Sequence, residues 1–533
     1  MIQFNDSVIG GGASNAVQVA GNAVLNFQNS TFDDWTGTYA IVASKGTLAV
    51  EGSTFTPALS ASKRGVQLQS GVSSAVLLGN SFTGTASYLL DNASSGDVKR
   101  QDSGYTFEKL NEGAYPYKAN RPKPASSQLF NVRTYGAVGN PDNVNPTVDD
   151  TAAIQAALTA AGNAGGGTVY MPAGIYRVEG HLTVPAGVEL RGSDDVPHRA
   201  AKYGPSTGTI LYAYEGKNTA DPDAATPFIM LNGNNAGVRG FSVHYPEQAT
   251  DSAANIKAYP WTIRGNGSGV YAFDMVLINP YKGYDFATHA TNNHYLNHVG
   301  GTALKEGIRI GNSTEGWVEH ALFNIPFWGR AYGLPGALNE SVSMFPVAGT
   351  YVGANLEAYV VTTGAQNEHM FNTFIFNSAV AFTFESNANA VVMNSASDHR
   401  GNAINVTGTG TSGVKIVNFL SSNYLENGAG ANALNISGGA IKVFNWNTKD
   451  DYQYVLNVTG GTAIVQGASF AHDAANVTGG SLTVNGAFFR DGGTQAAVAA
   501  GATGNFWGNI GGGGFTVSYA AGASGTSAYN ISR

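Results

Sequence analysis

The sequence contains no cysteine, and this absence removes three kinds of chemistry at once. Thiol catalysis, disulfide scaffolds and cysteine-ligated metal sites all need a sulfur atom that this chain does not have. Charged residues are also scarce, at 12% of the chain, and the formal net charge is -8. A chain with so few cations is poorly suited to neutralise a run of phosphates, so the composition argues against nucleic acid as a partner.

Long hydrophobic runs are missing as well. The chain begins with MIQFNDSVIGGG, in which no basic stretch precedes an apolar one. Nowhere does an apolar run approach the roughly 18 residues that cross a bilayer. We therefore expect no membrane partner, a secreted protein, and an export signal that lies outside this chain.

Glycine is abundant, with 70 residues, and it recurs within repeated patterns. The pattern Val/Leu-x-Gly-x-x-Phe begins at Val50, Leu77, Val465 and Val484. The pattern Asn-Val/Ile-Thr/Ser begins at Asn405, Asn435, Asn457 and Asn476, at intervals that match one coil of a solenoid. Short alternating segments such as Gly46–Val50 lie between these marks and read as strands. The repeats predict an all-β solenoid whose turns hold asparagine, a residue that tolerates left-handed backbone and whose amide can pair with the coil above.

One segment departs from the strand pattern. Thr147–Ala161 places Ile154 and Leu158 on one helical face, and Asp149 and Asp150 lie at its expected first turn. We predict a single amphipathic helix near residues 149–161. A solenoid leaves its apolar core open at each end, so we expect this helix to cap the first coil.

Three strings around this helix carry a family resemblance. They are FNVRTYGAVG (130–139), VDDTAAIQAALTAAGNAGGGTVYMPAGIYRV (148–178) and LTVPAGVELRG (182–192). They resemble the opening of the right-handed parallel β-helices of the pectate-lyase superfamily, which include pectinases, related glycoside hydrolases and phage tailspikes. The resemblance implies a right-handed parallel β-helix and a polysaccharide or oligosaccharide partner. Two departures count against ordinary pectin hydrolysis: the turn at 140–146 (NPDNVNP) is longer than the usual Gly-Asp-Gly, and the polygalacturonase signatures are absent.

The family-like opening divides the chain into three parts. We predict that residues 128–533 form the main parallel β-helix and catalytic domain, and that residues 96–127 form a proline-containing linker. Residues 1–95 share the coil rhythm, so we interpret them as extra β-helix-like coils. They read either as the tail of an upstream β-helix or as an appended β-domain that supports a homo-oligomer or carbohydrate contact. The first interpretation resembles tandem β-helix β-1,3-glucanases and would make this chain a piece of a longer protein.

Acidic residues recur at the turns toward the C-terminus. Equivalent positions on neighbouring coils lie about 4.8 Å apart. A glycoside hydrolase needs carboxyl groups about 5 to 5.5 Å apart for retention or about 6.5 to 9.5 Å apart for inversion, which one or two coils can supply. The carboxylates that we predict as catalytic are Asp398, Glu426, Asp450 and Asp451. His399 and Arg400 adjoin Asp398 and are predicted to bind substrate; the alternative is that all of these are exposed turn residues.

A second cluster combines aromatic and charged residues within four coils. Its predicted substrate-binding members are Glu247, Tyr281, Lys282, Asp285, Glu306, Trp328 and Arg330. Sugar rings stack on aromatic faces while charged groups hold their hydroxyls, so this composition suits a saccharide site. His289, His294 and His298 would align only on a helix, and we predict no metal site there.

These features predict a secreted bacterial glycoside hydrolase that uses a carboxylate pair on the β-helix face and no cofactor. A polysaccharide lyase is the alternative, with Lys282, Lys305 or Arg330 in the site and Ca²⁺ as a possible neutraliser of the uronate carboxylate. A third hypothesis is a non-catalytic glycan-binding adhesin or tailspike-like protein.

Overall fold

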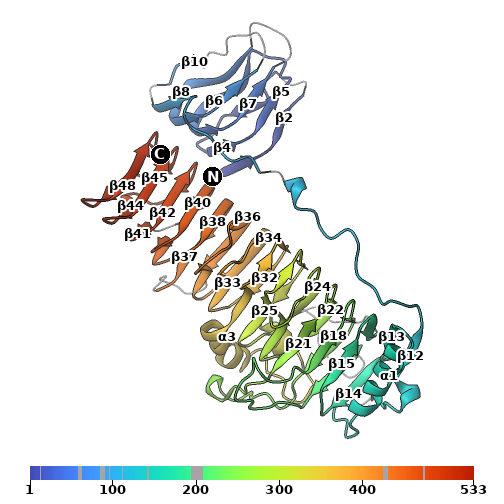
Figure 1. Cartoon of the computed structure of the whole chain (residues 1–533). Coiled ribbons are helices and arrows are strands. Elements are labelled where there is room, and N and C mark those ends of the chain that lie inside the picture. Colours follow the sequence, from blue (N-terminus) through green and yellow to red (C-terminus); the bar gives the residue numbers. More distant parts are fainter. Residues whose placement is uncertain are drawn as a thin grey trace. The chain divides into compact units, whose positions relative to one another are not determined.

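The computed structural model describes residues 1–11, 14–57, 63–83, 91–94, 96–110, 112–140, 143–193, 208–423, 430–471 and 474–533. These residues form an all-β, right-handed parallel β-solenoid with few helices (Figure 1). The predicted fold class is thereby confirmed at this level. Among the described residues, no helix combines the length and the apolar composition that crossing a membrane requires.

The chain divides into two compact units. Unit 1 comprises Met1–Tyr115, Lys415–Leu420 and Glu426–Arg533, and unit 2 comprises Pro116–Val414 and Ser421–Leu425. The structure thus groups the N-terminal and C-terminal segments together, whereas the sequence suggested three consecutive parts. The three-part division into 1–95, 96–127 and 128–533 stays a prediction.

Unit 2 winds between two parallel sheets. The first contains β12 (Leu129–Asn131), β13 (Gly167–Tyr170), β14 (Gly174–Val178), β16 (Val188–Arg191), β17 (Thr209–Ala213), β19 (Gly237–Arg239), β20 (Ser242–His244), β22 (Tyr271–Leu277), β24 (Tyr295–Gly301), β27 (Trp317–Glu319), β28 (Leu322–Phe323), β31 (Glu368–Phe371), β32 (Phe374–Phe376) and β34 (Ala390–His399). The second contains β15 (Leu182–Pro185), β18 (Ile229–Asn232), β21 (Trp261–Asn266), β23 (Lys282–Phe286), β25 (Glu306–Ile310), β29 (Glu357–Val361), β33 (Val380–Phe384) and β35 (Asn402–Val406), in that order. Because the pairing is parallel, each residue stands beside its counterpart from the next coil.

The core of the second sheet is a column of apolar side chains from alternate strand positions. Ile308 pairs with Tyr359, which pairs with Phe382 and then Ile404, and all four are fully buried. The rings of Tyr359 and Phe382 stack with centroids 5.0 Å apart. The positions next to such core residues hold three charged residues of the site described below, Arg264, Asp285 and Arg309.

Unit 1 contains parallel strands from both ends of the chain. The C-terminal strands are β37 (Asn432–Ile436), β38 (Ala440–Lys449), β39 (Tyr454–Val458), β40 (Thr462–Phe470), β41 (Ala475–Val477), β42 (Ser481–Asn485), β43 (Phe488–Phe489), β44 (Thr494–Val498), β45 (Thr503–Trp507), β46 (Ile510–Gly511), β47 (Thr516–Tyr519), β48 (Ser524–Ala528) and β49 (Ile531–Ser532). The N-terminal strands are β1 (Ile2–Asn5), β2 (Val8–Gly10), β3 (Val17–Val19), β4 (Val24–Gln28), β5 (Thr31–Asp33), β6 (Tyr39–Glu51), β7 (Thr54–Thr56), β8 (Arg64–Leu78), β9 (Ser81–Phe82), β10 (Asp91–Asn92) and β11 (Asp97–Gln101). Within this unit, Val76 and Leu78 of β8 pack in one apolar cluster with Phe488 and Ile510.

Besides the short 3-10 helices η2 (Val132–Tyr135) and η3 (Ala253–Asn255), two longer helical segments interrupt the coils in the described part of unit 2. The helix α1 (Thr151–Asn163) packs against β13 and β15, with Ile154 and Leu158 fully buried as the sequence predicted. It is internal in the chain, and its role as a cap stays a prediction. A second excursion between β28 and β29 contains α2 (Pro326–Gly329), the π-helix η4 (Met344–Gly349) and α3 (Thr350–Asn355). The sequence did not predict this excursion, because its turns are too short to display a helical period.

Candidate functional site

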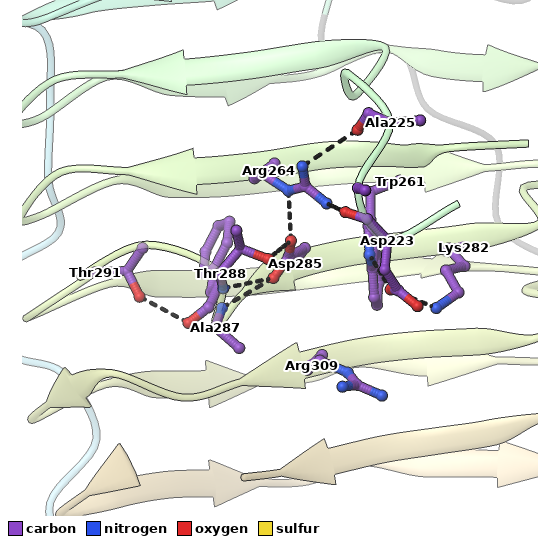
Figure 2. A network of polar contacts seen from close by, with 12 residues as sticks. Asp223, Ala225, Trp261, Arg264, Lys282, Asp285, Ala287, Thr288, Thr291 and Arg309 are labelled. Carbon is purple, nitrogen blue, oxygen red and sulfur yellow. Dashed lines mark hydrogen bonds and ion pairs between the residues drawn. The ribbon is translucent and has the colours of Figure 1, made fainter. Parts of the chain in front are cut away.

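The second sheet of unit 2 presents charged side chains on its outer face. In one row, Lys282 of β23 pairs with Glu306 of β25, which pairs with Glu357 of β29. In the adjacent row, Arg264, Asp285 and Arg309 stand side by side. We call the following residues the charged cluster: Asp223, Arg264, Lys282, Asp285, Glu306 and Arg309. Figure 2 labels all of them except Glu306.

Lys282 joins two carboxylates of this cluster. Its Nζ lies 2.6 Å from Oδ1 of Asp223 and 3.2 Å from Oε2 of Glu306. The ammonium also lies 4.8 Å from the centre of the Trp261 ring, whose Nε1 donates to the same Asp223 oxygen at 2.9 Å. A buried ammonium is tolerated only with such partners, so Lys282 fixes the relative positions of two acidic groups.

Behind this group, Arg264 and Asp285 form a buried ion pair. The Nε of Arg264 lies 2.5 Å from Oδ2 of Asp285, and the guanidinium also donates to the carbonyls of Asp223 and Ala225 (Figure 2). Asp285 is fully buried and accepts hydrogen bonds from the backbone N–H groups of Ala287 and Thr288. Its oxygens are therefore occupied by the protein, which disfavours a contact with substrate; the substrate-binding role of Asp285 stays a prediction. The pair instead holds the segment that carries Asp223.

The two carboxylates on Lys282 differ in their acidity. Burial raises the pKa of Glu306, although Arg309 and Lys282 both oppose that rise. For Asp223, burial also acts to raise the pKa, but the hydrogen bond and charge of Lys282 outweigh it and the pKa is lowered. Environments that push the pKa values of two neighbouring carboxyl groups apart in this way allow one group to act as an acid and the other as a base.

Two members of the charged cluster reach solvent. The side chain of Asp223 is 60% exposed and that of Arg309 is 34% exposed, whereas Lys282 and Glu306 are nearly covered. Arg309 also forms an ion pair with Glu306 from its own strand. An incoming ligand would therefore meet a carboxylate and a guanidinium, with the buried pair beneath them.

The other residues predicted for this region have separate surroundings. Glu247 is exposed and lies 2.8 Å from Lys217, and Arg330 lies 2.6 Å from Glu340. Tyr281 is half-buried and hydrogen-bonds to Tyr351, whose pKa is raised by burial and by that contact. Trp328 is fully buried and donates its indole N–H to the Gly336 carbonyl at 2.8 Å. The helical excursion encloses this ring, which disfavours stacking on a sugar; the substrate-binding role of Trp328 stays a prediction.

The predicted catalytic carboxylates fall in different parts of the chain. Asp398 lies half-buried on β34 of unit 2, Asp450 and Asp451 lie exposed in unit 1, and Glu426 lies outside the described residues. His399 is fully buried with Nδ1 3.0 Å from Ser397 Oγ, and burial lowers its pKa to about 3. A neutral, enclosed imidazole is poorly placed to meet substrate, and the role predicted for His399 stays a prediction. The catalytic role of the four carboxylates stays a prediction.

Three residues of the charged cluster were missed from the sequence. Arg309 could have been found by aligning KGYDF (282–286) with EGIRI (306–310), because this alignment puts Arg309 opposite Asp285. The same alignment with the preceding coil finds Arg264. Asp223 comes from a segment between coils, and no repeat marks it.

His294 and His298 of unit 2 have different surroundings. His294 is fully buried with Nε2 3.3 Å from Glu368 Oε2, whereas the His298 side chain is 61% exposed, so these two histidines do not converge. Within the part of the chain that the structure describes, no group of three or more His, Asp or Glu side chains is arranged to hold a metal ion.

Comparison with known proteins identifies related sequences and folds. A family model described as "Rhamnogalacturonase A/epimerase, pectate lyase-like" matches residues 129–487. Over 71 residues, 12% of this chain, the sequence is 51% identical to mannuronan C5-epimerase AlgE1 of Azotobacter vinelandii, a match that covers 5% of that protein. Over 51 residues it is 55% identical to alginate lyase 7 of the same organism, covering 10% of this chain and 5% of that one. The chain therefore spans a small part of the curated relatives it matches.

The chain is also similar to solved structures of low sequence identity. The A-module of mannuronan C-5 epimerase AlgE4 from Azotobacter vinelandii is 14% identical, with 76% of this chain and 97% of that chain covered and a TM-score of 0.44. An exopolygalacturonase from Thermotoga maritima is 11% identical, with 69% and 89% covered and a TM-score of 0.42. Neither likeness bears on the reaction.

Proposed function

This chain belongs to the rhamnogalacturonase A/epimerase, pectate lyase-like family, and from that premise we propose that it is an extracellular enzyme that modifies a uronate-containing polysaccharide. The proposed step is removal of the proton at C5, next to the sugar carboxylate. Return of a proton to the opposite face gives the C5 epimer, whereas loss of the C4 oxygen gives an unsaturated uronate. The matched stretches of a mannuronan C5-epimerase and an alginate lyase support this class of reaction.

The observation that carries the proposal is the pair of carboxylates on Lys282 with Arg309 beside it. Proton removal next to a carboxylate builds up negative charge, which a preorganised cation stabilises. In the proposal, the exposed guanidinium of Arg309 binds the uronate carboxylate. Asp223 is ionised and accepts the C5 proton, and Glu306, whose pKa is raised, supplies a proton.

The proton transfers balance for each of the two products. In epimerisation, the C5 proton goes to Asp223, and a proton from Glu306 reaches the opposite face of C5 through a water molecule. In elimination, the electron pair of the broken C5–H bond forms the C4–C5 double bond, and the departing C4 oxygen takes the proton of Glu306. Both routes use the charged cluster of unit 2, and the chemistry is proposed to belong to residues 128–533.

Glycoside hydrolysis is the second candidate, and the opposite pKa shifts of Glu306 and Asp223 favour it specifically. In that reaction, Glu306 would protonate the glycosidic oxygen and Asp223 would activate water or attack the anomeric carbon. A uronate is then not required, because neither step needs a neighbouring carboxylate.

One experiment separates these reactions. The protein is incubated in D₂O with polymannuronate, polyguluronate, polygalacturonate and a carboxyl-reduced polymer, and products are followed by NMR, by absorbance of unsaturated uronate and by reducing ends. Deuterium at C5 without chain cleavage identifies epimerisation, and unsaturated ends identify elimination. Reducing ends without unsaturation identify hydrolysis and contradict the primary proposal. No product on any polymer would contradict enzymatic activity and favour a glycan-binding adhesin or tailspike-like protein.

A further inference from the structure

A pocket of about 340 Å³ opens in unit 2 beside the helical excursion. Its volume lies within the range of about 300 to 1,000 Å³ that is typical of small-ligand sites. The pocket is lined by Phe345, Pro346, Gly349, Thr350, Asn377 and Arg400. Arg400 was predicted from the sequence to bind substrate, but the rest of this pocket was not foreseen.

Arg400 is the only charged residue among those lining residues, and no carboxylate of the described residues pairs with its guanidinium. Within the described part of the chain, its Nε is buried without a hydrogen-bond partner, and no carboxylate forms an ion pair with it. The other cations discussed above differ, because Lys282, Arg264, Arg309 and Arg330 each contact a carboxylate. A partly buried guanidinium is normally paired, so the Arg400 side chain is suited to receive an anionic group of a ligand.

The protein builds the pocket around this arginine. Asn377 is nearly fully buried, has a left-handed backbone (φ 67°), and donates from Nδ2 to the Gly349 carbonyl at 2.7 Å. This bond ties the turn after β32 to the end of η4. Gly353 of α3 leaves room for Arg400, since a Cβ there would lie 2.2 Å from Arg400 Cδ and 3.1 Å from Nη1.

The remaining lining groups suit a sugar ring. Phe345 is 44% exposed and offers part of an aromatic face, on which a pyranose can stack. Thr350, which carries a hydroxyl group, also lines the pocket. A guanidinium, a hydroxyl and an aromatic face together match a sugar that carries a carboxylate better than a neutral sugar.

The pocket lies along the same sheet edge as the charged cluster. The row that contains Glu306 continues through Glu357 and Val380 to Asn402, and Arg400 lies two residues before Asn402. Three strand steps of about 4.8 Å separate the two positions by about 14 Å along the solenoid axis. A polysaccharide extended along this edge would therefore meet the charged cluster with one sugar unit and the pocket with another.

We propose that the Arg400 pocket is a subsite that binds the carboxylate of a uronate unit other than the one that reacts. The inference rests on the proposed function for its substrate class. The guanidinium of Arg400 would hold the carboxylate by paired, charge-assisted hydrogen bonds while Phe345 contacts the ring. Such a contact would favour longer uronate oligomers over shorter ones and over neutral glycans.

The test is equilibrium binding by calorimetry with the full chain. The probes are oligomannuronate and oligogalacturonate of defined length, each with its carboxyl-reduced counterpart. Arg400→Ala should weaken binding of one or both oligouronates about 10- to 100-fold, the range expected for a lost hydrogen-bonded charge. Arg400→Lys should recover part of the affinity, and Gly353→Ala should weaken binding because its methyl group displaces the guanidinium. The matched control is Arg239→Ala, which removes an arginine from the first sheet of unit 2.

Thermal unfolding and product formation make each outcome decisive. The melting temperature of Arg400→Ala should fall only slightly, because the substitution loses packing against Gly353 but no hydrogen bond or ion pair to a described residue. Equal oligouronate affinity in Arg400→Ala and native protein, or no binding of any oligouronate, would overturn the subsite. An affinity that depends on Arg400 without any product would retain the subsite and contradict the proposed reaction. Product formation with unchanged affinity in Arg400→Ala would retain the reaction and reject the subsite.

Discussion

Lys282 and Glu306 stand opposite each other on neighbouring strands, with Nζ 3.2 Å from Oε2, although 24 positions separate them in the sequence. Both side chains are nearly covered, so each charge depends on the other and on the additional partners Asp223 and Arg309. The pair therefore serves two purposes, since it keeps the outer face of the sheet stable and presents an exposed carboxylate and guanidinium above it.

Removal of the Lys282 charge should destabilise the protein strongly. Lys282→Met leaves two carboxylates without their shared cation, and breaking a buried ion pair costs about 3 to 5 kcal/mol. Adding Glu306→Gln to Lys282→Met should recover part of that loss, because the second uncompensated charge is then gone. Denaturant unfolding of the single and double variants measures the coupling. Additive losses would mean that the two side chains do not interact.

The Arg264–Asp285 pair should be structural, and Glu247 should be dispensable for stability. Asp285→Asn removes a fully buried charge whose partners are Arg264 and two backbone N–H groups, so we expect a loss of several kcal/mol, about 3 to 5. Glu247→Gln breaks an exposed ion pair with Lys217 and should change stability by no more than about 1 kcal/mol. Thermal melts of both variants provide the comparison. An equal effect at the two positions would refute the structural assignment of Asp285.

Activity should depend on Asp223 and Glu306. Asp223→Asn and Glu306→Gln should each lower turnover about 10²- to 10⁴-fold, the usual range for a positioned acid or base. The competing assignment is tested by Asp398→Asn and Asp451→Asn, with Glu426→Gln alongside. Should these three variants lose turnover while Asp223→Asn and Glu306→Gln retain it, the chemistry would belong to the carboxylates predicted from the sequence. Circular dichroism of every variant controls for misfolding.

Stability of unit 1 should fall as the pH rises from about 4.5 to about 8 because of Glu51. Burial raises the pKa of this residue from 4.5 to about 8, although a hydrogen bond from Gln28 opposes the rise. Between these two values the folded chain keeps the proton and the unfolded chain has lost it, so raising the pH favours unfolding by up to about 1.4 kcal/mol per pH unit. The contribution of protonated Glu51 to the stability of the folded state is complete below pH 4.5 and is lost as the pH rises through about 8.

The variant Glu51→Gln should flatten this pH dependence. It keeps the shape of the side chain and its contact with Gln28, but it cannot ionise. Between pH 5 and pH 9, the melting temperature of Glu51→Gln should then stay nearly constant, whereas that of the native protein should decline. A parallel decline in both would assign the effect to another group, and Glu247→Gln provides an exposed control.

The sequence by itself determined the repeating coil. The phenylalanines of the Val/Leu-x-Gly-x-x-Phe pattern stack in unit 1, with the rings of Phe55 and Phe82 5.0 Å apart. The asparagines of the second pattern form the predicted amide ladder, since Asn457 donates to Asn435 at 2.8 Å and Asn476 donates to Asn457 at 2.9 Å. A short period is visible in the sequence because each coil must repeat the same inward and outward positions to stack on the last one.

Tertiary structure alone decided which polar residues meet. From the sequence, Lys282, Asp285 and Glu306 were expected in one region. Only the strand register shows that Lys282 contacts Glu306, whereas Asp285 is fully enclosed. Trp328 lies in the excursion between β28 and β29, where packing encloses its ring, and Asp223 arrives from a segment with no repeat. Counting along the chain identifies the core-facing positions, because these repeat in every coil. It cannot identify the partners that the connections bring to the outer face, because the connections vary in length and have no period.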